Sequence, residues 1–352
     1  MSIRLSRVGT SELAACAAGA FLLMSTARSL HAELTVATDA NGQVLVQDGG
    51  RPVLRYNART VPVPDGVSGI YAVARSGYIH PLFGPDGTVL TADYSKDHPH
   101  HRGIYWAWPE VTYKGKTHDL HALQGVFSRP EGVPHWETNG DAATLEATSR
   151  WLWENKTPIV REAVQIDIDA ATSEMRVVDL TFSYEALEPG VTIARRGREA
   201  YGGLNVRLST REQQQMVTHT GLPCFPATQA WGEVIGIPPG GADPVGVLIL
   251  QHPGNVGYPE DWIQYPKLNW LQPAFPASGT AHELLAGEAL TLKYRIIVRM
   301  GNALSTPREE LWQSYHSDWK PFGNLKAYTF GQDTAYLRKW KRIIRTCPPE
   351  ER

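Results

Sequence analysis

The sequence predicts a mainly β fold, in which one large antiparallel β-sandwich is followed by a C-terminal helix. Along most of the chain, apolar and polar residues alternate with a period of two, as expected of strands that bury one face. Turn signals such as "DANG", "PDG" and "PPGG" separate these stretches. Helical signals are scarce before residue 305. Many antiparallel strands with one late helix are typical of a β-sandwich.

Residues 1–32 have the layout of a secretory signal peptide. Arg4 and Arg7 precede an apolar run over residues 13–24, and the small residue Ala32 precedes the expected cleavage point. The run is too short to form a membrane-spanning helix. We therefore expect a periplasmic or secreted protein, with no integral membrane segment in the mature chain.

The rest of the chain is predicted to form one domain. Residues 43–57 predict two strands around an Asp-Gly-Gly turn, and residues 164–169, 175–187 and 288–301 predict further strands. Neither a repeat nor a low-complexity linker interrupts the pattern. We expect residues 33–320 to form a single β-sandwich of two broad sheets. This size suits, by analogy, the supersandwich of galactose-mutarotase-like proteins.

A helix is predicted where the strand pattern ends. Thr306 is the expected N-cap, Pro307 takes the first helical position and Glu309 would complete a capping box. Residues 321–352 are expected to form a partly helical tail, in which a basic stretch is explained by an amphipathic helix. Without residues 1–32, 31 Lys and Arg stand against 35 Asp and Glu, a net charge near −4. This balance gives no reason to expect a nucleic-acid partner.

The three cysteines leave two alternatives open. Cys16 ends a "LAAC" segment with the form of a lipidation box, but most of the apolar run follows this cysteine instead of preceding it. Cys224 and Cys347 could form one disulfide bond in an oxidising compartment. Their distance cannot be read from the sequence.

The segment "DYSKDHPHHRGIYWAWPE", residues 93–110, concentrates chemically reactive groups. Pro99 excludes a regular central strand, so His98, His100 and His101 are expected on an irregular loop that leads into a strand. In an extended chain His98 and His100 would point to one side and His101 to the other. Loops held by a β scaffold are where reactive groups usually lie.

The strand after this loop is predicted to form a sugar-binding surface. Trp106, Trp108 and Glu110 should share one face, with Tyr105 and Ala107 on the other. Aromatic rings stack on the apolar face of a pyranose, whose hydroxyl groups need polar partners. The two tryptophans are therefore candidates for a sugar platform.

Three interpretations of the segment remain open. His98, His100 and His101 could bind a divalent metal, alone or with a carboxylate. Alternatively, His100 or His101 could transfer protons beside Glu110, while Arg102 stabilises a developing negative charge. The same residues could instead form a buried, hydrogen-bonded corner without a catalytic role.

Other polar groups could complete a ligand-binding site. Two glycines precede a strand whose face carries two polar side chains. Residues 246–270 run from a buried apolar strand into a long loop rich in aromatic and acidic residues. The further candidates for ligand binding are His80, Asn205, Arg207, His252 and Trp262.

Several segments together resemble one bacterial family. The segments "RPVLRYN", "YIHPLFGPDG", "DHPHHRGIYWAW", "YGGLNVR", "GVLILQHPGN" and "LTLKYRIIVRMG" are similar to the family labelled "methane oxygenase PmoA", also named DUF6807. The resemblance covers roughly residues 51–301. It implies an exported β protein that works alongside sugar oxidoreductases and glycan-degrading proteins.

These observations favour a carbohydrate-active enzyme that hydrolyses, eliminates or epimerises a glycoside or sugar derivative. A glycosidase would need two carboxylates, and Glu110 with Glu260 or Asp261 is the expected pair. The ligand would be a small molecule or an oligosaccharide, and a divalent metal could serve as cofactor. The alternatives are a non-catalytic glycan-binding module and, from the family label, a metal-dependent oxygenase.

Overall fold

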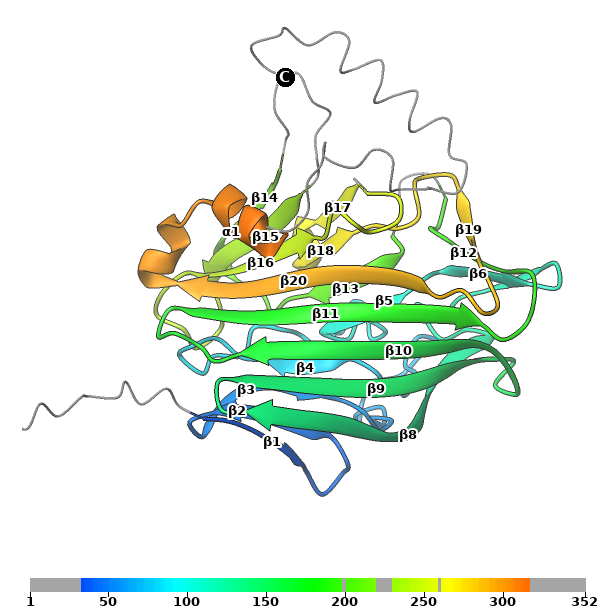
Figure 1. The fold of residues 1–352 in the computed structure, drawn as a ribbon, viewed down its shortest axis with the longest axis horizontal. Coiled ribbons are helices and arrows are strands. Elements are labelled where there is room, and N and C mark those ends of the chain that lie inside the picture. Colours follow the sequence, from blue (N-terminus) through cyan, green and yellow to red (C-terminus); the bar gives the residue numbers. More distant parts are fainter. Residues whose placement is uncertain (1–32, 198–200, 220–229, 259–260, 317–352) are drawn as a thin grey trace, which may run out of the picture. The chain divides into compact units, whose positions relative to one another are not determined.

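A computed structural model describes residues 33–197, 201–219, 230–258 and 261–316. The predicted signal peptide, the predicted tail, all three cysteines and Glu260 lie outside the described residues, so the expectations that concern them remain predictions. Twenty strands, one α-helix and two short 3-10 helices make up the described part. The strands form two eight-stranded sheets and one four-stranded sheet (Figure 1).

The first sheet is antiparallel and contains the strand that follows the histidine loop. In order across the sheet, its strands are β1 (Leu34–Thr38), β2 (Val44–Asp48), β3 (Arg51–Tyr56), β4 (Ile79–Leu82), β5 (Ile104–Ala107), β13 (Gly203–Arg207), β18 (Trp270–Pro273) and β17 (Trp262–Tyr265). A 3-10 helix at Pro266–Leu268 joins β17 to β18.

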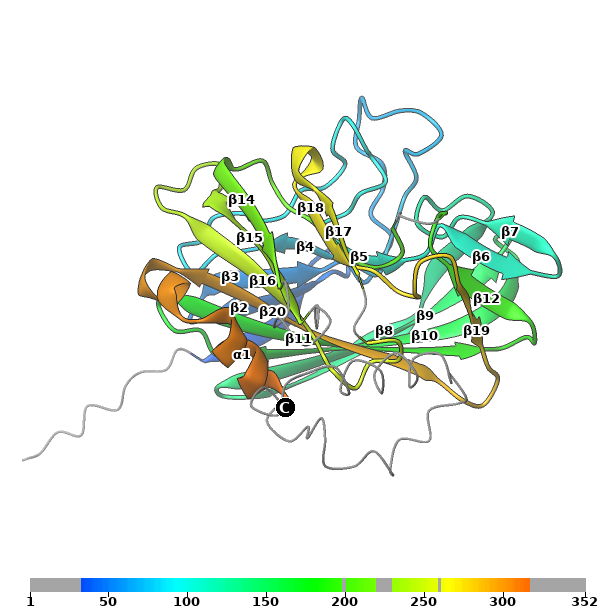
Figure 2. The ribbon, with the colours of Figure 1, turned by 90° about the horizontal axis from the view of Figure 1, so that it is seen from above.

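The second sheet contains the longest strands. In order across it lie β14 (Glu212–Thr218), β15 (Trp231–Ile237), β16 (Val245–Gln251), β20 (Leu290–Met300), β11 (Met175–Ala186), β10 (Thr157–Asp169), β9 (Ala142–Trp153) and β8 (Val126–Asn139). Burial alternates residue by residue along β11, as the period of two predicts. Its inward side chains pack against the first sheet in one hydrophobic core (Figure 2).

The third sheet is small and was not predicted. Its strands are β19 (Ala281–Leu284), β12 (Val191–Ala194), β6 (Glu110–Tyr113) and β7 (Lys116–His118). The predicted antiparallel β-sandwich is confirmed. So is the hairpin of β2 and β3, where Gly49 and Gly50 adopt positive φ angles of 55° and 78°. Such angles favour glycine because it has no Cβ atom.

The C-terminal helix is present but is held differently from the prediction. Helix α1 spans Arg308–Tyr315, its N-cap is Pro307, and no side chain caps it. The prediction of a capping box formed by Thr306 and Glu309 is therefore wrong. The Thr306 carbonyl instead accepts a hydrogen bond of 2.7 Å from Arg299. Tertiary contacts made by Arg308 and by other side chains hold the helix on the second sheet.

A 3-10 helix at Gly301–Ser305 leads from β20 into α1. No helix within the described ranges is long and apolar enough to cross a membrane.

A candidate three-histidine site

The candidate site lies on the face of the first sheet that points away from the second sheet. Trp106 of β5 faces the second sheet, where it donates a hydrogen bond to Glu162 of β10. Its neighbour Tyr105 therefore points to the opposite face. Asn205 of β13 pairs directly with Tyr105, so both side chains project from that face. Loops that precede β4 and β5 lie over it (Figure 2).

The histidine loop makes a turn instead of an extended chain. The backbone N–H of His101 donates to the carbonyl of His98 at 3.0 Å. The turn places the rings of His100 and His101 beside each other, with centroids 4.6 Å apart. The expected placement of these two rings on opposite sides is therefore wrong. The expected irregular loop before β5 is confirmed.

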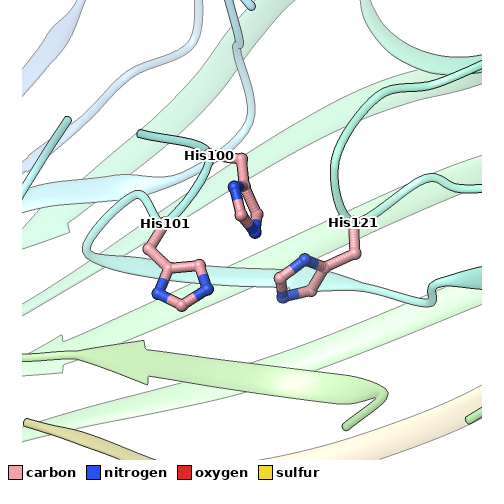
Figure 3. Close-up of side chains that lie close together, drawn as sticks. All are labelled: His100, His101 and His121. Carbon is pink, nitrogen blue, oxygen red and sulfur yellow. The ribbon is translucent and has the colours of Figure 1, made fainter. Parts of the chain in front are cut away.

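His121 supplies the third ring of the site, from the loop that follows β7. Its backbone N–H donates to the carbonyl of Trp108, and its own carbonyl accepts from the guanidinium of Arg75 at 2.8 Å. The His121 ring lies 5.3 Å from that of His100 and 5.5 Å from that of His101. One nitrogen from each of the three rings lies within 4.8 Å of the others (Figure 3).

A chain of hydrogen bonds favours one tautomer of His121. The backbone N–H of Gly202 donates to Gln272 Oε1, so Gln272 donates through Nε2 to Asn205 Oδ1 at 2.6 Å. The amide nitrogen of Asn205 donates to the carbonyl of Gly203. Asn205 Oδ1 is thus an acceptor, and the His121 tautomer with the hydrogen on Nε2, 3.2 Å away, donates to it. The lone pair of His121 then resides on Nδ1.

Burial favours the neutral form of all three imidazoles. Burial lowers the pKa of His100 to about 4, and the charges of nearby arginines contribute. Burial also holds the pKa of His101 and of His121 well below the ordinary value. His101 is 2% exposed and His121 is completely buried. Desolvation disfavours the charged imidazolium, so each ring keeps a lone pair available.

Aromatic and charged side chains surround the three histidines. Tyr71 lies 5.0 Å from His100, Tyr201 4.6 Å from His121, and Trp270 4.5 Å from His101, each distance joining ring centroids. Tyr71 is 41% exposed and His100 is half-buried. A ligand can therefore approach from the side of Tyr71 and His100. The charged neighbours are the ion pairs Arg196–Asp119 and Arg207–Asp97 and the buried cation Arg75.

Two predicted ligand-binding residues lie at this site. Asn205 contacts His121 as described, and Arg207 places Nη1 3.5 Å from His101 Nδ1. Arg207 also donates to both oxygens of Asp97 at 2.9 Å. The predicted metal ligand His98 is not a member of the histidine group. Its ring stacks on the outer side of His101 at 4.7 Å, and its Nδ1 lies 3.2 Å from Asp97.

Glu110 lies at the start of β6 in the third sheet, not on the strand of the tryptophans. It lines a surface depression of about 530 Å³, together with Asp119 and Arg196. The latter two residues border the histidine site as well. The expected partner carboxylate of Glu110 was Glu260 or Asp261, and only Asp261 is among the described residues. Asp261 forms an ion pair with Arg195 at 3.2 Å.

Arg102 is a structural residue in this fold, which corrects its predicted role as an electrostatic clamp. Its side chain is 0% exposed and forms an ion pair with Asp93. The guanidinium also lies 3.4 Å from the ring centroid of Tyr94 and donates to the hydroxyl of Tyr78. These partners satisfy its charge within the protein.

The predicted tryptophan platform is also wrong. Trp106 and Trp108 are 3% and 0% exposed and lie in the core between the two large sheets. Their indole N–H groups donate to Glu162 and to the carbonyl of Phe275, at 2.8 and 2.7 Å. A buried ring cannot stack on a sugar, so the aromatic surface of the site comes from other residues.

Replacing Trp108 with phenylalanine tests this correction. The change leaves the buried carbonyl of Phe275 without its donor, so we expect the free energy of unfolding to fall by about 1–3 kcal/mol. Ligand binding should not change. Urea denaturation of Trp108→Phe, beside a Trp136→Phe control on the edge strand β8, measures the effect. A loss of ligand binding at unchanged stability would restore the platform.

Three other predicted ligand-binding residues make their contacts away from the histidine group. His80 of β4 lies 2.9 Å from the hydroxyl of Thr91. The ring of His252 packs against Tyr315 of α1, 5.3 Å away. Trp262 lies against Gly232 in the core, where an added Cβ would meet its ring at 2.7 Å.

Comparison with known proteins gives a family match and distant structural similarities. The model of a family described as "Family of unknown function (DUF6807)" matches residues 43–313. No curated protein matches the chain.

Among solved structures, a galactose mutarotase related enzyme from Lactobacillus acidophilus is 11% identical, with a TM-score of 0.30 over 77% of this chain and 98% of the other. The GH36 alpha-galactosidase AgaA from Geobacillus stearothermophilus is 10% identical, with a TM-score of 0.35 over 78% of this chain and 42% of that enzyme. A putative kojibiose phosphorylase from human microbiome is 9% identical, with a TM-score of 0.33 over 79% and 32% of the two chains. This chain therefore spans less than half the length of the last two proteins.

Proposed function

Because the chain belongs to the DUF6807 family, whose function is unknown, we propose a function from the chemistry of its site. The protein is a carbohydrate-active enzyme, and its reacting groups are the neutral imidazoles of His100, His101 and His121. One observation carries this proposal: two buried rings and one half-buried ring bring nitrogens close to one another beneath an aromatic rim. A merely structural corner would pair these nitrogens with donors or acceptors.

The rim suits a ring-shaped, polyhydroxylated ligand. Tyr71 and Tyr201 offer aromatic faces to the apolar side of a sugar. Arg196 and Asp119 offer charged partners to its hydroxyl groups. His100 is the most accessible of the three histidines and would meet the substrate first. The predicted signal peptide would place this activity in the periplasm or outside the cell.

A neutral imidazole with an accessible lone pair is a proton acceptor at neutral pH. Beside a bound sugar, it can remove a proton from a hydroxyl group, from water, or from a carbon next to a carbonyl group. These steps begin hydrolysis, elimination and epimerisation, which are the three reactions expected from the sequence. Proton transfer of this kind contributes about 10²–10⁴-fold to the rate.

The described residues do not form the site of two histidines and one carboxylate that an iron oxygenase would need. Their one candidate metal-binding group contains three histidines and no carboxylate, and the nearby Asp97 and Asp119 are engaged by arginines. The oxygenase suggested by the family label therefore has less support than the carbohydrate enzyme.

The proposal is tested by a screen for turnover of neutral and oxidised glycosides with residues 33–352. His100→Ala should lower kcat/KM by about 10²-fold or more, because it removes a proton acceptor without opening the core. His135→Ala, on the exposed part of β8, is the matched control and should keep full activity. Equal turnover by the wild type and His100→Ala would refute the proposal. Saturable glycan binding without turnover would instead support a glycan-binding module.

A further inference from the structure

We propose that His100, His101 and His121 form a binding site for one divalent transition-metal ion, for which zinc is the simplest probe. The inference deepens the proposed function, because it adds a cofactor to the same three imidazoles and does not depend on the identity of the substrate. With the ion bound, the imidazole lone pairs would hold the metal, and a metal-bound hydroxide would be the proton acceptor in their place. The sequence predicted a different ligand set, His98, His100 and His101. In the proposed site His121 replaces His98.

The hydrogen bonds assign a metal-binding atom to the His121 ring. His121 uses Nε2 to donate to Asn205, which leaves Nδ1 free; this atom is buried and has no hydrogen-bond partner among the described residues. His101 Nδ1 lies 3.5 Å from Arg207 Nη1, which can only donate. Metal binding through His101 Nε2 therefore requires the tautomer with the hydrogen on Nδ1, which gives up this long contact. In Figure 3 both of these atoms and a nitrogen of His100 point into the space between the rings.

The second layer of the site is already in place. Metal-binding histidines usually donate their other ring N–H to a fixed acceptor, which sets the tautomer and the ring orientation. Asn205 plays this part for His121, and it is held in turn by Gln272 and Gly203. The hydroxyl of Tyr105 lies 2.7 Å from the same His121 nitrogen. His121 is therefore oriented before any metal arrives.

Burial of a free lone pair needs a physical reason. An unpaired polar atom in the interior costs about 1–3 kcal/mol, and His121 Nδ1 is such an atom. A neighbouring imidazole could satisfy it only as a donor at hydrogen-bond distance, and no such bond joins these rings. A metal ion would satisfy the lone pairs of all three rings at once.

The ligand types indicate the class of metal. Three imidazoles suit zinc, copper, iron or nickel, whereas magnesium and calcium prefer oxygen ligands. Three protein ligands leave at least one coordination position for water or substrate, as in catalytic zinc sites. Nitrogens around a tetrahedral zinc ion stand about 3.4 Å apart, so the rings must close inwards. His100 can do this because it is half-buried and lies on a turn.

The surrounding charges affect what fills the open position. Arg196 and Arg207 are each paired with an aspartate, while Arg75 donates only to backbone carbonyls in the hydrogen bonds of the described residues. With a bound divalent ion the site would carry excess positive charge. An anionic oxygen, such as a hydroxide, an alkoxide or a carboxylate, is the class of ligand that this charge favours.

The test is isothermal titration of metal-free protein, residues 33–352, with zinc chloride and separately with magnesium chloride. We expect about one zinc ion per chain and no magnesium binding. His101→Ala and His121→Ala should weaken zinc binding about 100-fold or more. Asn205→Ala should weaken it about 10–100-fold through loss of ring orientation. His98→Ala is the matched control and should stay within about threefold of the wild type, because that ring is outside the group.

Two further measurements keep the proposal open to refutation. If the buried variants fail to fold by circular dichroism, His100→Ala, at the half-exposed position, takes their place. Absorption of bound cobalt(II) reports on the ligands directly and should be lost in the same variant. Absence of zinc binding, or zinc binding that survives His100→Ala and His101→Ala, would overturn the proposal. No sugar enters these experiments, so their failure would leave metal-free acid–base catalysis untouched.

Discussion

Replacement of Arg102 with methionine is expected to lower the free energy of unfolding by about 3–5 kcal/mol. Arg102 is completely buried and paired with Asp93, whose side chain is only 13% exposed. Without the guanidinium, this carboxylate would be left largely buried without its counter-charge. The loss of the ring contacts with Tyr94 and Tyr78 adds to the cost. Urea denaturation followed by tryptophan fluorescence measures the change.

The matched control is Arg161→Met, which removes an exposed arginine from an ion pair with Glu185. Surface ion pairs contribute about 0–1 kcal/mol, so this variant should remain close to the wild type. If Arg102→Met kept its stability but lost turnover, Arg102 would be the electrostatic clamp that the sequence suggested, and its structural assignment would be wrong.

Replacement of Glu233 with alanine is expected to have an effect of the same size, about 3–5 kcal/mol. The carboxylate of Glu233 is 0% exposed and accepts two hydrogen bonds of 2.7 Å from the buried Arg299. It also pairs with Arg308 of α1 at 2.5 Å. Its removal leaves a buried arginine without a counter-charge and detaches the start of α1 from the second sheet.

A double variant separates the two parts of this effect. Glu233→Met with Arg299→Met removes both buried charges, so it should recover most of the stability that Glu233→Ala loses. Glu309→Ala, which removes a partly exposed carboxylate from the same helix, serves as the control in thermal unfolding. A Glu233→Ala variant as stable as the wild type would show that α1 is held by its apolar contacts alone.

The main architecture could be predicted because long strands carry a clear period. Strands β9, β10, β11 and β20 have 11 to 13 residues each, enough for alternation to be recognised. The third sheet was missed because its strands have only three or four residues. At that length the pattern cannot be distinguished from a loop.

The sequence could not show which of the two faces of β5 points towards the core. All four residues of this strand are buried, so alternation marks no exposed face. The tryptophans were predicted at the site, whereas the opposite face of β5, with Tyr105, forms it. The cause is that loops cover the outer face of the sheet, and a single sequence does not reveal such tertiary coverage.

The histidine loop was found, but its partner was not. His121 lies three residues after His118, and nothing in the local sequence distinguishes the two histidines. His118 packs on Trp153 instead. His121 differs from His118 in its contacts with Arg75 and Asn205. These two partners come from distant parts of the chain, so the local sequence does not reveal them. Tyr201 and Trp270 were missed for the same reason.

We propose above that His100, His101 and His121 act as one centre. A crystal structure of the protein soaked in zinc, with anomalous data collected at the zinc absorption edge, shows whether a single ion binds to all three. We expect one strong anomalous peak about 2.0–2.1 Å from Nδ1 of His121 and from one ring nitrogen each of His100 and His101. A peak at His98 and Asp97 instead, or no peak in this space at full soaking, would contradict it.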